Sequence, residues 1–217
     1  MTVHFLHIGK TGGSAIKAAL RPFRGKRGIV FHPHWFPASG VPANERFFFC
    51  VREPVSRFIS AFNSRLRMGK PVGFVPWDAD EEWAFSRFQT PEALAIALSG
   101  NDAAKAREAR RAMRSIRHVR QHQHEWFPAP ALEYLRERAD GVVWIGFQES
   151  LDSDFEILKQ ALRLPAHTAL PAEAVAAHRV PEGFSISLSE AGRRNLAAWY
   201  AEDVRFVEGL RALRSVR

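Results

Sequence analysis

Residues 3–14 read VHFLHIGKTGGS, and this short stretch decides the fold. Val3 to Ile8 is an apolar run of strand length, and the glycine-rich turn Gly9–Gly13 ends it. Ser14 is a favourable N-cap for a helix from Ala15 to Leu20. The stretch therefore predicts a strand, a tight turn and a helix in direct succession.

The same alternation continues outward from this stretch. Short apolar runs at Ile29–Phe31, Phe47–Val51 and Val142–Ile145 predict three more strands. The run at Phe47–Val51 is apolar throughout, which is typical of a strand buried on both faces of a parallel sheet. Helical patterns follow at residues 55–67 and 152–162, so we expect an α/β fold with three layers and a mostly parallel central sheet flanked by helices.

Length and composition favour one folded domain. The chain has 217 residues, 46% of them hydrophobic and 25% charged, which predicts a single domain over residues 1–217. Cys50 is the single cysteine, which excludes an internal disulfide and a cysteine-based zinc site. No apolar run approaches the ~18 residues that span a bilayer. We expect a soluble protein of a reducing compartment, the cytoplasm, without an N-terminal membrane anchor because the first strand starts at Val3.

The charge balance favours an anionic partner. Lysine and arginine number 31 against 23 acidic residues, a net charge of +8. A basic helix is expected within Lys105–Arg120, with seven basic residues and one acidic residue. Such a run is usually a solvated face, and it could equally steer an acidic substrate towards a cleft.

The turn after the first strand has the composition of a phosphate-binding loop. Glycines let backbone N–H groups converge on an anion, the helix N-terminus adds a partial positive charge, and Lys10 adds a full one. The Walker A pattern of nucleotide hydrolases needs a glycine at the position of His4, which weakens that interpretation. A plain strand-to-helix turn with an exposed lysine is the alternative.

A second candidate anion site follows the strand at Phe47–Val51. Arg52 stands at the carboxyl end of that strand, where ligands of open α/β sheets collect. Ser60 lies eight residues further on, about two helical turns, so a helix can return its hydroxyl towards the strand end. The two side chains could grip a second phosphate, or Arg52 could simply start a helix in which Ser60 packs as a small residue.

These residues together resemble a known family. The segments Ile8–Ser14 and Val51–Pro54, with Ser60, resemble the sulfotransferases that use 3′-phosphoadenosine 5′-phosphosulfate (PAPS), in particular the carbohydrate branch with the heparan sulfate 2-O- and 6-O-sulfotransferases. Similar segments recur at Gln123–Trp126, Gly146–Leu151 and Tyr200–Asp203.

The resemblance implies a P-loop-like fold and a set of cofactor-binding residues. The loop Gly9, Lys10, Thr11, Gly12, Gly13 and Ser14 would hold the 5′-phosphosulfate, and Arg52 with Ser60 would hold the 3′-phosphate. Gln123 would contact the cofactor as well. Lys10 would also be catalytic, because its charge would neutralise the phosphate as it leaves.

Transfer of a sulfuryl group to an alcohol needs a base, and histidine suits that task at neutral pH. The pair His32 and His34 follows the second strand and resembles the His-x-His of the 2-O-sulfotransferases, in which the second histidine is the base. That reading favours His34, whereas the 6-O pattern of a histidine three places before a tryptophan selects His32, because Trp35 follows.

The resemblance implies no metal. His118 and His122 are four residues apart and would share a face on a helix, but the sequence places no third ligand beside them. We therefore expect metal-free sulfuryl transfer from PAPS to a hydroxyl-bearing acceptor. The acceptor is expected to be a saccharide, which can be acidic, and we expect no nucleic-acid partner and no membrane span. Two alternatives stay open: a magnesium-dependent P-loop kinase or NTPase that uses Lys10 and Thr11, and a polyanion-binding protein without catalysis.

Overall fold

The computed structural model describes residues 2–25, 28–172 and 186–215. Its contacts divide the chain into two compact units. The first contains Met1–Glu53, Gln123–His178 and Arg205–Arg217, and the second contains Pro54–His122 and Arg179–Val204. A single domain over the whole chain stays a prediction.

The first unit is built on a parallel sheet. Its strands are β1 (Val3–Leu6), β2 (Ile29–Phe31), β3 (Arg46–Val51) and β4 (Val142–Phe147), in the spatial order β2-β1-β3-β4. All three strand pairs are parallel, and Phe5 of β1 lies between Phe31 and Phe48. The prediction of an α/β fold with a parallel central sheet is confirmed.

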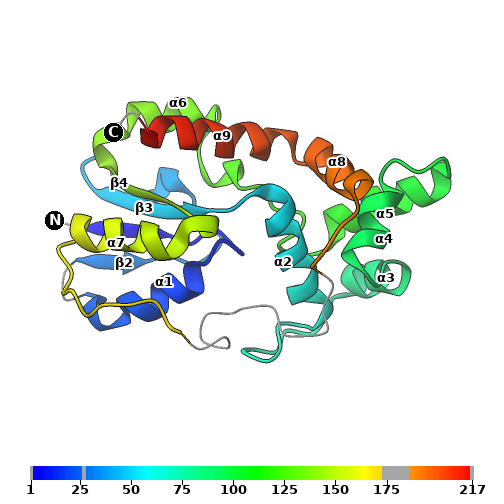
Figure 1. Ribbon diagram of the computed structural model, residues 1–217, viewed down its shortest axis with the longest axis horizontal. Coiled ribbons are helices and arrows are strands. Elements are labelled where there is room, and N and C mark those ends of the chain that lie inside the picture. Colours follow the sequence, from blue (N-terminus) through cyan, green and yellow to red (C-terminus); the bar gives the residue numbers. More distant parts are fainter. Residues whose placement is uncertain (1, 26–27, 173–185, 216–217) are drawn as a thin grey trace. The chain divides into compact units, whose positions relative to one another are not determined.

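Helices cover both faces of this sheet (Figure 1). One face packs on α1 (Gly13–Leu20) and α7 (Leu151–Ala161), and the other on α6 (Ala131–Glu137) and the second half of α9 (Ala201–Ser215). The period of two along a strand explains the division, because neighbouring residues point to opposite faces. Three layers follow, as predicted, with cores formed by Phe5, Ile16, Phe48, Phe155 and Leu158 on one face and by Phe47, Phe49, Leu135, Phe206 and Leu210 on the other.

The second unit is helical. It contains α2 (Pro54–Leu66), α3 (Ala79–Arg87), α4 (Pro91–Ala97), α5 (Ala103–Ser115) and α8 (Glu190–Trp199). Their shared core is formed by Phe58, Phe62, Phe85, Leu94, Met113, Leu196 and Tyr200. Single 3₁₀ turns elsewhere in the chain are η1 (Arg21–Phe23), η2 (Ala38–Gly40), η3 (His124–Trp126), η4 (Ala139–Gly141) and η5 (Gln148–Ser150).

Two helix boundaries differ from the sequence prediction. Helix α1 begins at Gly13 with Gly12 as its N-cap, so the prediction that Ser14 caps it was wrong. Gly12 has a φ of 88°, a conformation that glycine adopts without strain, and this lets the helix start earlier. Helix α5 ends at Ser115 because Ile116 becomes extended and fully buried, so the end of the basic run is not helical.

Residues 190–215 form two helices. Ser189 caps α8, accepting a hydrogen bond from the Gly192 amide, and the helix ends at Tyr200 before α9 begins. The Tyr200 ring is buried, and its hydroxyl donates to the Val119 carbonyl at 2.7 Å. No helix among the described residues is long and apolar enough to cross a bilayer.

Candidate anion-binding site

The topology of the sheet places a switch point at the carboxyl ends of β1 and β3. Strand β1 lies between β2 and β3, so the chain leaves β1 towards one side and later returns on the other. Ligands of open α/β sheets bind at such a switch point. The loop after β1 and Arg52 after β3 flank it, and both belong to the first unit.

The loop after β1 is held in a tight turn by its own residues. Lys10 and Gly12 have φ angles of 69° and 88°, and the Thr11 hydroxyl, 1% exposed, donates to the Ile8 carbonyl at 2.9 Å. The Ala15 amide donates to the Gly12 carbonyl at 3.0 Å, which starts α1. A turn of this kind directs main-chain amides to one side, where an anion can bind them.

Gly13 is required by its neighbour. A Cβ atom at this position would lie 2.1 Å from the His7 ring, so no larger residue fits while His7 stays in place. The first turn of α1 carries no acidic side chain, so its positive end is not neutralised from within the helix. The six predicted loop residues, Gly9, Lys10, Thr11, Gly12, Gly13 and Ser14, therefore form one continuous turn and helix start.

Arg52 is fixed at the end of β3 by Gln123. The Arg52 amide donates to Gln123 Oε1 at 2.9 Å, and Gln123 Nε2 donates to the Arg52 carbonyl at 2.7 Å. Gln123 is fully buried. The sequence predicts Gln123 as a cofactor contact, and the structure shows it clamping the main chain of Arg52; a direct bond to a nucleotide stays a prediction.

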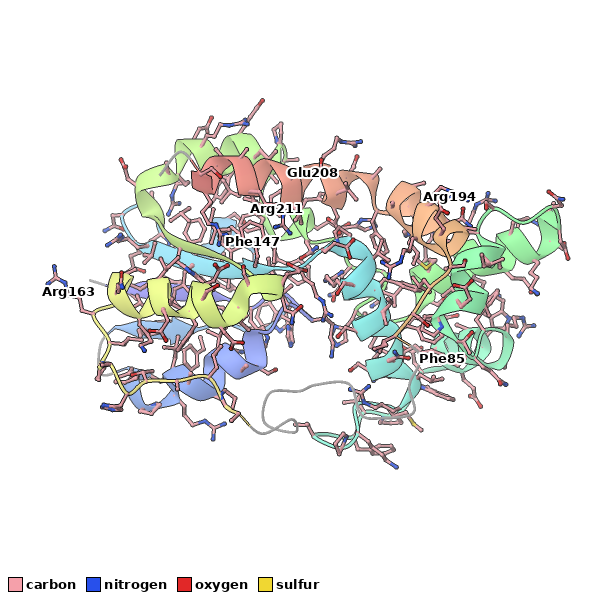
Figure 2. All side chains as sticks on the ribbon, viewed as in Figure 1. Phe85, Phe147, Arg163, Arg194, Glu208 and Arg211 are labelled. Carbon is pink, nitrogen blue, oxygen red and sulfur yellow. The ribbon has the colours of Figure 1, made fainter. Side chains whose placement is uncertain are left out.

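Charged side chains continue along the same edge at the end of β4. Glu149 accepts a hydrogen bond from the Glu53 amide at 2.7 Å and lies 3.7 Å from Arg211. The Arg211 guanidinium also lies over the Phe147 ring, 4.6 Å from its centre (Figure 2). Arg214 stacks on the same ring at 4.5 Å. These contacts hold two more cations beside the last residue of β4.

Ser60 lies in α2 of the second unit, where it is buried. Arg57, on the same helix, is also buried and donates to the Gln121 carbonyl at 2.7 Å. Pairing of Ser60 with Arg52 of the first unit stays a prediction.

The two histidines after β2 have different partners. His34 Nδ1 lies 2.9 Å from the His7 carbonyl and the two rings are 4.0 Å apart, which places His34 beside the start of the loop. A carbonyl only accepts, so His34 Nδ1 carries the proton in this bond. His32 instead bonds through Nε2 to His4 Nδ1 at 2.8 Å and stacks on Phe36.

Lysine 17 ties the segment after β2 to α1. Its Nζ donates to the His32 carbonyl at 3.0 Å. Burial lowers the pKa of Lys17, and the nearby charge of Arg24 lowers it further. Burial also lowers the pKa of His32, followed by the charges of His4 and Lys17. The neutral form of His32 is thereby favoured at neutral pH.

The sequence prediction missed His4, His7 and Glu45. His4 and His7 interrupt the apolar run of β1, and such polar residues in a buried strand are a signal that partners exist. No sequence pattern marks Glu45 as a partner of His4, because Glu45 precedes β3 and comes close to His4 only through the register of the sheet. His4 Nε2 and Glu45 Oε2 lie 2.5 Å apart.

Three arginines of the basic run Lys105–Arg120 make contacts within the second unit. Arg111 stacks on Trp83 at 4.0 Å, Arg114 lies over Trp199, and Arg117 pairs with Asp78 at 3.1 Å. Steering of an acidic acceptor by this run stays a prediction.

His118 and His122 do not form a helical pair. His118 lies beyond the end of α5 and has a φ of 63°, so it does not share a helical face with His122. His122 Nδ1 instead lies 3.8 Å from Asp203.

No family model matches the chain, and searches of curated proteins and of solved structures find no match either.

Proposed function

We propose that this chain is a PAPS-dependent sulfotransferase with a P-loop-like fold, which moves a sulfuryl group to the hydroxyl of a saccharide acceptor. One observation carries the proposal: the glycine turn with Lys10 follows the strand at the switch point of a parallel sheet, and Arg52 is clamped at the end of the neighbouring strand. Two anion-binding groups at adjacent strand ends suit a nucleotide with phosphates at both its 3′ and 5′ positions.

The residues fit the charge distribution of PAPS. Main-chain amides of the loop would bind the 5′-phosphosulfate. Packing requires the two glycines themselves, since a Cβ at Gly12 would lie 2.8 Å from Leu151 and one at Gly13 would meet His7. Arg52 would bind the 3′-phosphate, with Ser60 as its proposed partner. PAPS supplies the sulfuryl group and leaves as 3′-phosphoadenosine 5′-phosphate.

Lys10 and a histidine would do the remaining chemistry. As the new sulfur–oxygen bond forms and the bond to the phosphate breaks, negative charge grows on the leaving phosphate, where Lys10 stabilises it. The acceptor hydroxyl loses its proton to a histidine of the segment 32–34. One proton is released for each sulfate ester formed, so the base must be neutral before the next turnover.

The structure also bears on the kinase alternative. The Walker A pattern would place a loop glycine at residue 4, but His4 lies inside β1 and pairs with Val30 and Phe47. Strand β3 ends before Arg52, where a magnesium-binding aspartate would be needed. Both features favour the sulfotransferase over the kinase.

Calorimetric titration tests the proposal. 3′-Phosphoadenosine 5′-phosphate should bind with micromolar affinity without a metal, and Arg52→Ala should weaken it by at least about tenfold, or 1.4 kcal/mol. Arg163→Ala, a substitution at an exposed arginine remote from the strand ends, is the matched control. Binding of ATP with magnesium alone would overturn the proposal in favour of a kinase, and binding of neither nucleotide would leave a polyanion-binding protein.

A further inference from the structure

A chain of three side chains runs along the sheet from one edge to the other. Glu45 directly precedes β3, His4 lies within β1, and His32 directly follows β2. The strands are parallel, so Glu45 stands at the amino edge and His32 at the carboxyl edge, where the glycine loop also lies. The chain of side chains thus connects the candidate site to the opposite edge of the sheet.

The two histidine rings are placed for a direct hydrogen bond. His4 Nδ1 and His32 Nε2 are 2.8 Å apart, and the ring planes differ by only 12°. A ring N–H and the lone pair of a facing ring nitrogen both lie in the ring planes, so this near-coplanar arrangement aligns them. One of the two nitrogens must be protonated and the other must not.

Glu45 decides which nitrogen carries the proton. The hydrogen bond from His4 lowers the pKa of Glu45, so its carboxylate is ionised at neutral pH and only accepts. His4 Nε2 therefore donates to Glu45 Oε2. A neutral His4 then has an unprotonated Nδ1, which accepts from His32 Nε2–H, and the neutral His32 ring keeps its lone pair on Nδ1.

Burial and exposure differ along the chain of three. His4 is buried, His32 is half-buried, and the Glu45 side chain is 29% exposed. Among the described residues, the His32 ring makes no other hydrogen bond, and its face stacks on Phe36 at 3.6 Å. Its Nδ1 is thus the end of the chain at which a proton can be taken up.

We infer that Glu45, His4 and His32 form a proton relay in which His32 Nδ1 accepts the proton of the acceptor hydroxyl. His4 and Glu45 are positioning residues that act through His32. This inference rests on the proposed function and assigns the base role to His32, where the sequence favours His34. His34 donates its Nδ1 proton to a main-chain carbonyl, which adds no counter-charge, whereas His32 is linked through His4 to the Glu45 carboxylate.

Each proton that enters the relay displaces another along it. When His32 takes a proton at Nδ1, its Nε2 proton passes to His4 Nδ1, and His4 becomes an imidazolium whose Nε2–H faces the Glu45 carboxylate. The ion pair stabilises the added charge, and the reverse steps restore the neutral rings. The pair of rings takes up only one added proton, because two imidazolium rings whose nitrogens lie 2.8 Å apart would repel each other strongly.

The charged groups around the relay act on the protonation of His32 in opposite directions. From α1, Lys17 bonds to the His32 carbonyl and opposes protonation of the ring, and Arg24 adds positive charge near Lys17. At the other end Thr2 bonds to Glu45. The opposing charges keep His32 neutral at rest, and Glu45 makes protonation attainable during the reaction.

Nitrogen-15 NMR of the histidine rings tests the relay without any need for turnover. In the wild-type protein above pH 7, both His4 and His32 should be Nε2–H tautomers, with signals assigned from single His→Gln variants. The pair should take up one proton well before the second, and Glu45→Gln should lower the pH at which the first proton binds. Glu137→Gln, at an exposed position of α6, is the control and should change nothing. Independent titration of the two rings, or an Nδ1–H tautomer of His32, would overturn the relay.

Kinetics test the catalytic assignment separately. His32→Ala should lower turnover by at least about a hundredfold, while 3′-phosphoadenosine 5′-phosphate still binds. Glu45→Gln should move the acid limb of the kcat/KM profile to lower pH, because the imidazolium loses its counter-charge. Normal turnover in His32→Ala would overturn the assignment to His32. Failure of the nucleotide to bind the wild-type protein would instead overturn the proposed function, and the NMR result would still decide the relay.

Discussion

The side-chain amide of Gln123 bonds at both ends to the main chain of Arg52, with distances of 2.9 and 2.7 Å. The two residues are 71 positions apart in sequence, and Gln123 is buried, so the clamp is shielded from water. It fixes the direction in which the chain leaves β3. The Arg52 guanidinium therefore starts from a main chain that has little freedom.

Gln123→Ala should weaken binding of 3′-phosphoadenosine 5′-phosphate by about tenfold, which corresponds to 1.4 kcal/mol. The reason is that Arg52 loses its fixed starting point and must be ordered by the ligand. Calorimetry measures the change, and Gln160→Ala, at an exposed position of α7, is the control. Unchanged affinity in a folded Gln123→Ala protein would show that the clamp has no part in binding.

Glu81→Gln should lower the free energy of unfolding by about 3 to 5 kcal/mol. Glu81 is fully buried and accepts from Arg65 Nε at 2.7 Å and from the Arg117 amide at 3.0 Å. The neutral variant leaves the buried Arg65 guanidinium without its counter-charge. Chemical denaturation measures the loss.

A matched control for Glu81 exists on the surface of the same unit. Glu108 pairs with Arg87 at 3.2 Å, and both side chains are exposed. Glu108→Gln should cost less than about 1 kcal/mol, because solvent screens the pair. Equal losses in the two variants would contradict the role assigned to burial.

Cys50 should not react with thiol reagents in the folded protein. It lies in β3 with no exposed surface, and burial raises the pKa of its thiol well above the ordinary range. A chromogenic disulfide reagent at pH 8 should therefore modify Cys50 only at the rate of unfolding, and fully in denaturant. Fast labelling without denaturant would show that β3 opens locally.

Stability should fall as the pH is lowered from 7 through the ordinary range of histidine, and His32 should contribute to this fall. Its folded-state pKa lies below the unfolded value near 6.5, so the unfolded chain binds the proton first. The stabilising contribution is complete above that range and is lost towards the lower folded pKa. Denaturation midpoints between pH 5 and 8 should show a shallower slope for His32→Gln than for the wild-type protein, and equal slopes would contradict the lowered pKa.

Sequence patterns predicted those elements whose formation depends only on residues close in the sequence. The apolar runs at β1, β3 and β4 are local signals, and the structure confirms them. The start of α1 was misplaced by two residues, because Gly12, with a φ of 88°, takes the cap position in place of Ser14. The division between α8 and α9 depends on burial of Tyr200, a tertiary contact.

The candidate site also contains residues that the sequence could predict and residues that it could not. The loop residues and Arg52 could be found because each directly follows an apolar run. The relay could not, because Glu45 and His32 become neighbours of His4 only when β1 lies between β2 and β3. Strand order is set by packing of the whole unit, and no local pattern in the sequence encodes it.

Because His7 contacts Gly13, the residue that position 13 can accept depends on the residue at position 7. A histidine ring occupies the space that a side chain at residue 13 would need, since a Cβ there would lie 2.1 Å from it. Variation at residue 13 alone can return only glycine, whereas a small residue at position 7 would open the helix start to alanine or serine. The choice of residues in the loop is thus limited by His7, which directly follows β1, and an engineer who redesigns the loop must begin at that position.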